Sequence, residues 1–149
     1  MKSLLNPVYS KEMIERINRL TPSSAALWGK MRVDQMLAHL NAFFNAALGE
    51  VKQERVLSGY LFGWIAKKKI LSDQPFGKGL PTAKAFLAKG EYDFEAEKEH
   101  LIALIEHYTA TKGKDVNKYP HTFFGHLTTM EWDKLITKHL EHHLSQFEV

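Results

Sequence analysis

The chain has 149 residues, of which 44% are hydrophobic and 25% are charged, and its formal net charge is +3 at pH 7. These values are ordinary for a globular protein with a sizeable core, and they predict one domain over residues 1–149. Cysteine is absent, which excludes disulfides, thiolate metal sites and a cysteine nucleophile.

The positive charge is mild and spread along the chain, with Lys67-Lys68-Lys69 as its densest run. Nucleic-acid-binding domains usually cluster more charge on one face, so a nucleic-acid partner is not expected. No segment approaches the ~20 apolar residues that cross a bilayer, and residues 1–10 lack the apolar run of a signal peptide. We therefore expect a cytoplasmic protein with no membrane partner.

Apolar residues at three- and four-residue spacing predict amphipathic helices in the first half of the chain. Ser10 is expected to cap a helix over residues 11–20. A second helix follows over residues 33–48. A shorter third helix over residues 58–70 ends in lysines, which suit the negative end of a helix dipole.

The second half of the chain continues the pattern after a long break. Residues 72–90 are rich in Pro and Gly and predict a long loop. Asp93 is expected to begin a fourth helix. Thr128 and Glu131 open the last helix with the spacing of a capping box. Because no stretch alternates as a strand would, four or five helices predict an all-α bundle.

A pair of histidines in the last helix is the most informative feature of the sequence. His139 and His143 lie four residues apart, within the apolar stripe that includes Leu140 and Leu144. At about 100° per residue, both rings point to the buried face, one turn apart. Burying imidazoles is costly unless their nitrogens find partners, and a metal ion is one such partner. Hydrogen bonds to backbone or tyrosine are the alternative.

A third ligand is needed, because catalytic zinc-type sites typically use three protein ligands and leave one position open. His39 is the best candidate, since it flanks the apolar stripe of another long helix and bundles build metal sites from facing helices. Gln146, on the same side as His143, is placed to make a supporting hydrogen bond. His142 is a weaker candidate, at the edge of the stripe.

The other histidines fall into two groups. His100 and His107 lie opposite the apolar stripe of the fourth helix and are expected on the surface. His121 and His126 lie in the loop before the last helix, and from that position we take them as candidates for proton transfer.

The order and spacing of these motifs resemble a known family. Residues 36–40 (Met-Leu-Ala-His-Leu) and residues 139–146 (His-Leu-Glu-His-His-Leu-Ser-Gln) are similar to motifs of the DinB/YfiT-like superfamily of metalloenzymes. Residues 28–39 and 121–132 resemble one uncharacterised branch of it. The similarity runs from Trp28 to Phe147.

The resemblance implies a four-helix bundle, up-down-down-up, with one long crossover and a short extra helix. It implies a divalent metal held by His39, His139 and His143, with zinc or nickel in first place and iron or copper also compatible. It further implies a small-molecule substrate, a low-molecular-weight thiol as cosubstrate, and a homodimer.

Two functional hypotheses follow. In the first, the metal lowers the pKa of a bound thiol or water, and the enzyme transfers the thiol to an electrophile or hydrolyses the substrate by metal-hydroxide. In the second, the bundle is a non-catalytic binding module and its histidines are structural. A basic DNA-associated stress protein is a weaker third hypothesis that depends on charge alone.

Overall fold

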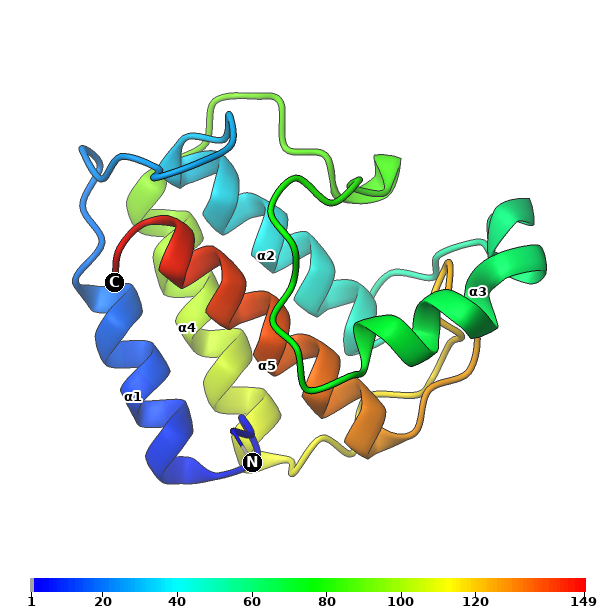
Figure 1. The fold of residues 1–149 in the computed structure, drawn as a ribbon. Coiled ribbons are helices and arrows are strands. Elements are labelled where there is room, and N and C mark those ends of the chain that lie inside the picture. The colour runs from blue at the N-terminus through cyan, green and yellow to red at the C-terminus, as the bar shows by residue number, and fades with distance from the viewer. Residues whose placement is uncertain (1) are drawn as a thin grey trace.

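The computed structural model describes residues 2–149, and that part of the chain contains helices and no strand. Its elements in chain order are α1 (Pro7–Asn18), α2 (Val33–Ala47), α3 (Leu57–Ile70), the 3₁₀ turn η1 (Lys84–Phe86), α4 (Phe94–Ala110) and α5 (Thr129–Gln146). Four of them, α1, α2, α4 and α5, pack as a bundle, and α3 projects from one end of it (Figure 1).

The order of directions in the bundle is up-down-down-up. Helices α1 and α5 run one way, while α2 and α4 run the other way and pack along each other (Figure 1). The crossover between α2 and α4, residues 48–93, contains α3 and η1. The all-α bundle with a long crossover and an extra short helix, expected from the sequence, is therefore confirmed.

The start of the first helix was predicted wrongly. The side chain of Asn6, not Ser10, caps it by accepting a hydrogen bond from the Val8 backbone, and Pro7 occupies the first helical position. Proline suits that position because its fixed φ is helical and its missing N–H would be unpaired there. Ser10 is buried inside the helix, against the Thr109 hydroxyl.

The other predicted helix starts are close to the observed ones. The Asp93 side chain caps α4. The Thr128 hydroxyl and the Glu131 carboxylate form the expected capping box of α5. The predicted stripe of α5 is buried in the core, as Trp132, Leu135, Ile136, Leu140, Leu144 and Phe147. This burial fixes which face of α5 points into the bundle.

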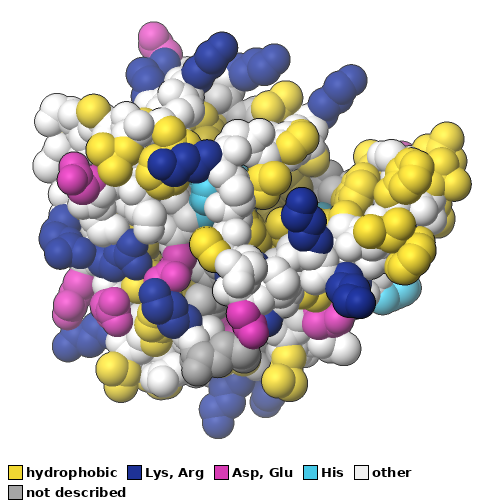
Figure 2. All heavy atoms as spheres, in the orientation of Figure 1, with side chains coloured by type: hydrophobic (Ala, Val, Ile, Leu, Met, Phe, Trp, Pro, Cys, Tyr) yellow, Lys and Arg dark blue, Asp and Glu magenta, His cyan; other side chains and the backbone are white. Residues whose placement is uncertain are grey.

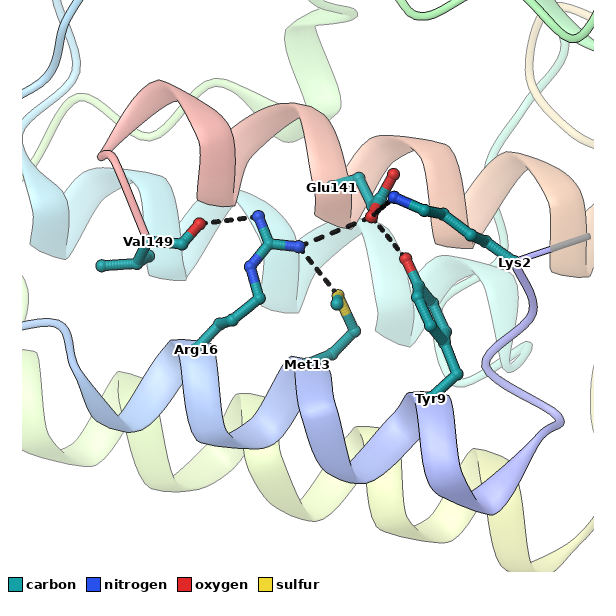
Figure 3. Close-up of polar contacts among 6 residues, drawn as sticks. All are labelled: Lys2, Tyr9, Met13, Arg16, Glu141 and Val149. Atoms are coloured by element: carbon teal, nitrogen blue, oxygen red, sulfur yellow. Dashed lines mark hydrogen bonds and ion pairs between the residues drawn. The ribbon is translucent and has the colours of Figure 1, made fainter.

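A polar cluster joins the N-terminal segment and α1 to the outer side of α5 (Figure 3). The Glu141 carboxylate accepts a hydrogen bond from the Tyr9 hydroxyl at 2.5 Å and pairs with Lys2 at 2.7 Å. Arg16 approaches the same carboxylate and donates to the Val149 carbonyl at 2.6 Å. Burial raises the pKa of Tyr9, and its bond to Glu141 raises it further, so the hydroxyl keeps its proton.

Removing this acceptor should destabilise the bundle. In Glu141→Ala, the half-buried Tyr9 hydroxyl and Arg16 lose their shared partner, and we expect the free energy of unfolding to fall by about 1–3 kcal/mol. Glu106→Ala, which removes an exposed acid of α4, is the matched control and should change stability little. Urea denaturation of both variants checks this; equal stability would contradict a structural role for the cluster.

No helix in the described part of the chain is long and apolar enough to cross a membrane.

Candidate metal centre

Three imidazole rings from two helices converge between α2 and α5. His39 lies in the middle of α2, and His139 and His143 lie one turn apart on α5. The Nε2 atom of His139 is 2.9 Å from that of His39 and 3.1 Å from that of His143. Potential ligand atoms of all three lie within 4.8 Å of one another. The structure therefore brings together the three residues that the sequence selected.

The crossover orients the first of these rings. Phe86, in η1, places its carbonyl oxygen 2.8 Å from Nδ1 of His39. A carbonyl only accepts, so Nδ1 of His39 must donate its hydrogen. In the neutral ring, Nε2 then carries a lone pair, and that lone pair faces the other two histidines.

A second chain of hydrogen bonds orients His143. Its Nδ1 atom lies 2.8 Å from Oε1 of Gln146, and the Gln146 amide nitrogen donates to the Trp28 carbonyl at 2.7 Å. The bond to Trp28 fixes which end of the amide is the oxygen, so Nδ1 of His143 donates and Nε2 is again a lone pair. The hydrogen bond expected of Gln146 is therefore present.

The connector before α2 leaves room for this amide. Gly29 has a positive φ of 83°, and a Cβ atom there would come within 2.7 Å of the Gln146 amide nitrogen. A side chain at position 29 would therefore be strained and would push Gln146 away from Trp28.

Loss of the Gln146 amide should weaken the centre without removing a ligand. Outer partners of metal-binding histidines typically contribute about 10–100-fold in affinity, and we expect that loss in Gln146→Ala. Gln74→Ala, at an exposed position of the crossover, is the control. Competition with a chromophoric chelator measures both affinities, and an unchanged value for Gln146→Ala would contradict the role of this amide.

His139 has an apolar environment. Its ring lies 4.4 Å from the Phe43 ring and 6.2 Å from the Phe76 ring, centroid to centroid. Its Nδ1 atom is buried and has no hydrogen-bond partner among the described residues. The residue as a whole retains some exposed surface, so the cluster is not sealed from solvent.

The geometry fits a divalent cation. With metal–nitrogen bonds of about 2.0–2.1 Å, ligands at bond angles between 90° and 109° have nitrogens about 2.9–3.4 Å apart. The two measured separations, 2.9 and 3.1 Å, lie in that range. Three imidazole nitrogens are also a ligand set compatible with zinc, nickel, iron or copper. The three residues can thus hold a metal ion, whose identity the arrangement does not select.

The same burial keeps the rings neutral. Burial lowers the pKa of His39 below its usual value and lowers that of His143 to about 3. The pKa of His139 lies well below its ordinary value, first because of burial and then because four other imidazoles are close, those of His143 and His39 having the largest effect. Neutral imidazole is the metal-binding form, so no proton has to be displaced near neutral pH.

His121 lies near the cluster but outside it. Its Nδ1 atom accepts hydrogen bonds from the backbone N–H groups of Phe123 and Phe124, so the ring proton is on Nε2. The ring lies 5.5 Å from Trp132 and lines a small pocket together with Phe43. Burial lowers the pKa of His121 to about 4, so near neutral pH it can donate a hydrogen bond but carries no charge.

The remaining histidines are not part of the cluster. His126 is exposed, and within the described residues its one hydrogen bond is through the backbone carbonyl, which accepts from the Lys67 ammonium group. His142 is partly buried beside the three-histidine cluster, and its ring centroid lies 5.1 Å from that of His143 and 5.8 Å from that of Trp28. His100 and His107 are exposed on α4, as predicted.

Sequence reasoning missed the backbone groups that orient the histidine rings, because a backbone group cannot be recognised from residue type. The carbonyls of Phe86 and Trp28 orient two rings through backbone atoms, and any residue type offers a carbonyl. Lys138 donates to the carbonyls of Ile70 and Ser72, which ties the crossover to α5 beside the cluster. Further along, the same crossover supplies the Phe86 carbonyl to His39.

Fold and site together define an all-α helical bundle with a buried cluster of three histidines suited to a metal ion. The family model described as "Protein of unknown function (DUF1569)" matches residues 5–149, and the chain belongs to that family. Among curated proteins and among solved structures, nothing matches the chain.

This match corrects the resemblance to the DinB/YfiT-like superfamily. The family that the comparisons show is DUF1569, over nearly the whole chain, and they do not show the superfamily. The motifs that suggested it are short, and two helices that each present histidines to a bundle core can produce them for geometric reasons alone. What the resemblance implied about a thiol cosubstrate and a homodimer therefore loses that support.

Proposed function

We propose that this protein is a metal-dependent enzyme in which His39, His139 and His143 hold one divalent cation. The observation that carries the proposal is the convergence of three Nε2 atoms at 2.9 and 3.1 Å, with two of the rings held in the ligand tautomer. Bonds to Phe86 and Gln146 provide that orientation. Metal sites in proteins use such outer partners to fix the ligand rings.

Hydrogen-bond counting favours a cation over a purely structural cluster. Because His39 and His143 both donate through Nδ1, both of their Nε2 atoms need a donor. Without a cation, only the single ring hydrogen of His139 is available between them, and its own Nδ1 then also lacks a partner. A cation satisfies all three Nε2 lone pairs, and only Nδ1 of His139 remains unpaired.

The proposed chemistry is activation of a small protic nucleophile for attack on an electrophilic substrate. A divalent ion held by neutral ligands keeps its full charge and lowers the pKa of a water or thiol that it binds. The three histidines hold the ion, and Phe43 and Phe76 limit the water around it. The Nε2 hydrogen of His121 is placed to donate to an acceptor atom of a small substrate. We assign no such role to His126, because its side chain is exposed.

A metal-loading assay tests the proposal. Tag-free protein is loaded separately with zinc, nickel, iron(II) or copper(II). It is then assayed with activated esters and phosphoesters, and with a fluorogenic electrophile plus a thiol. We expect turnover with at least one metal that is lost in His139→Ala. If the loaded protein turns over no substrate of either type, the enzyme proposal is contradicted.

The alternative is a helical binding module without catalysis, in which the cluster is structural. The narrowness of the pocket beside His121 is the observation in its favour. It predicts that stoichiometric metal raises the melting temperature while no substrate of either class is converted.

A further inference from the structure

Helix α3 presents apolar side chains to solvent. Six large hydrophobic residues of this helix are between 52% and 78% exposed, and we call them the α3 patch: Leu57, Tyr60, Leu61, Phe62, Trp64 and Ile65. Figure 2 shows hydrophobic side chains gathered at the end of the molecule that α3 forms. Exposed apolar groups scattered singly need no explanation, but a continuous set on one helix indicates a contact surface.

The inner face of α3 is fixed by two glycines. Gly59 and Gly63, one turn apart, are its only buried residues, and a Cβ atom on either would collide with the Phe123 carbonyl. Helix α3 therefore sits directly against the backbone of the loop that carries His121. At about 100° per residue, Leu57, Leu61 and Trp64 lie on the opposite side and point outward.

The size of the α3 patch suits a protein interface. An aromatic side chain has about 150–250 Å² of surface, so three partly exposed aromatics and three aliphatics leave on the order of 700 Å² uncovered. The largest apolar patch on a typical monomer is about 300–600 Å², and each partner in a standard interface buries about 800 Å². The exposed area is therefore comparable to what one side of a standard interface buries, and because the six residues span about 200° around the helix, a second copy must reach beyond Leu57, Leu61 and Trp64 to cover all of it.

The spacing and charges favour a second copy of the chain. Leu57, Leu61 and Trp64 follow each other at intervals of four and three residues, the spacing of a helix–helix contact. Glu54, in the coil just before α3, and Lys68, in the last turns of α3, are both exposed and lie seven residues before and after Leu61. In an antiparallel pair with its two-fold axis at Leu61, the acidic end of each patch meets the basic end of the other.

We propose that two copies of this chain form a homodimer through the α3 patch, antiparallel about Leu61, with Glu54 of each copy near Lys68 of the other. A lipid surface is the competing occupant, because tryptophan and lysine are also used at membrane interfaces. Lys67 pairs with Glu131 at 2.8 Å and Glu54 would repel an anionic bilayer, whereas the exposed Lys68 and Lys69 would attract one. The dimer is therefore favoured by the pairing of Glu54 with Lys68 between copies and not by net charge.

Sedimentation velocity over a range of protein concentrations tests the dimer. We expect wild-type protein to dimerise, and Leu61→Glu to raise the dimer Kd by roughly 100-fold, as at a central interface position. Met130→Glu is the matched control, since Met130 is 72% exposed on α5 and outside the α3 patch. A wild type that stays monomeric, or a dimer that Leu61→Glu leaves intact, would overturn the proposal.

Charge reversal tests the register. Lys68→Glu and Glu54→Lys should each raise the dimer Kd by roughly 10-fold, and the double variant should return it to near the wild-type value. A double variant that is weaker than either single one contradicts the antiparallel pairing.

A vesicle experiment tests the competing occupant. If the free protein is monomeric, and if it floats with phosphatidylcholine–phosphatidylserine vesicles while Leu61→Glu does not, the α3 patch binds lipid instead. Metal content should be the same in all these variants, so this test is independent of the proposed function.

Discussion

His39→Ala, His139→Ala and His143→Ala should each lose stoichiometric metal binding, with affinity reduced by at least about 100-fold. Each substitution removes one of three converging nitrogens, and the two that remain cannot enclose the ion. The loss should exceed the ~10–100-fold expected for an outer partner such as Gln146. Metal analysis of tag-free protein by mass spectrometry measures this directly.

A control variant and conservative replacements accompany these three substitutions. His100→Ala removes an exposed histidine of α4 and should leave metal content unchanged. Where an alanine variant folds poorly, the Gln or Asn variant at the same position keeps the packing.

Zinc should also stabilise the folded protein. At 100 times its Kd it should stabilise wild-type protein by about 2.7 kcal/mol, which raises Tm by roughly 5–10 °C in a chain of this size. An equal rise in His139→Ala would contradict the assignment.

The metal-free protein should lose stability as the pH falls from 7 to 5. Burial lowers the pKa of His143 to about 3 and that of His121 to about 4, whereas in the unfolded chain both have ordinary values near 6.5. Between these limits, the unfolded state binds protons that the folded state does not, so stability is full above the unfolded pKa and falls below it. Each of these two groups should contribute roughly 2 kcal/mol of the loss.

Urea denaturation at several pH values, with a chelator present, checks this dependence. His39 and His139 have lowered pKa values for the same reason and act in the same direction. His107→Ala, at an exposed position, should leave the pH profile unchanged. A free energy of unfolding that stays level from pH 7 to pH 5 would mean that the buried rings are protonated in the folded state.

Periodicity predicted the bundle because most helices bury one apolar stripe. The stripe of α5 and its capping box are local signals, and both are found as expected. The first helix shows where local signals are ambiguous, because Ser10 and Asn6 are both residue types that cap helices. Proline favours the first helical position, so Pro7 is the signal that selects Asn6 as the cap. Helix α3 has apolar residues all around, so no stripe predicts that its two glycines face inward and Trp64 faces out.

The histidine cluster was accessible to sequence reasoning for a specific reason. His139 and His143 lie inside an apolar stripe, where polar groups are costly, and His39 flanks the stripe of a neighbouring helix. What periodicity does not contain is the path of the crossover, which brings the Phe86 carbonyl to His39. Nor does it separate His121, held by two backbone N–H groups, from His126, which the same loop leaves exposed.

Anomalous X-ray diffraction at the absorption edge of the bound metal, on crystals of tag-free protein, tests the central claim most directly. We expect one strong peak bonded to Nε2 of His39, His139 and His143, at about 2.0–2.1 Å from each if the ion is zinc. A peak held by other residues, or metal-saturated crystals in which the three rings contact only one another, would contradict it.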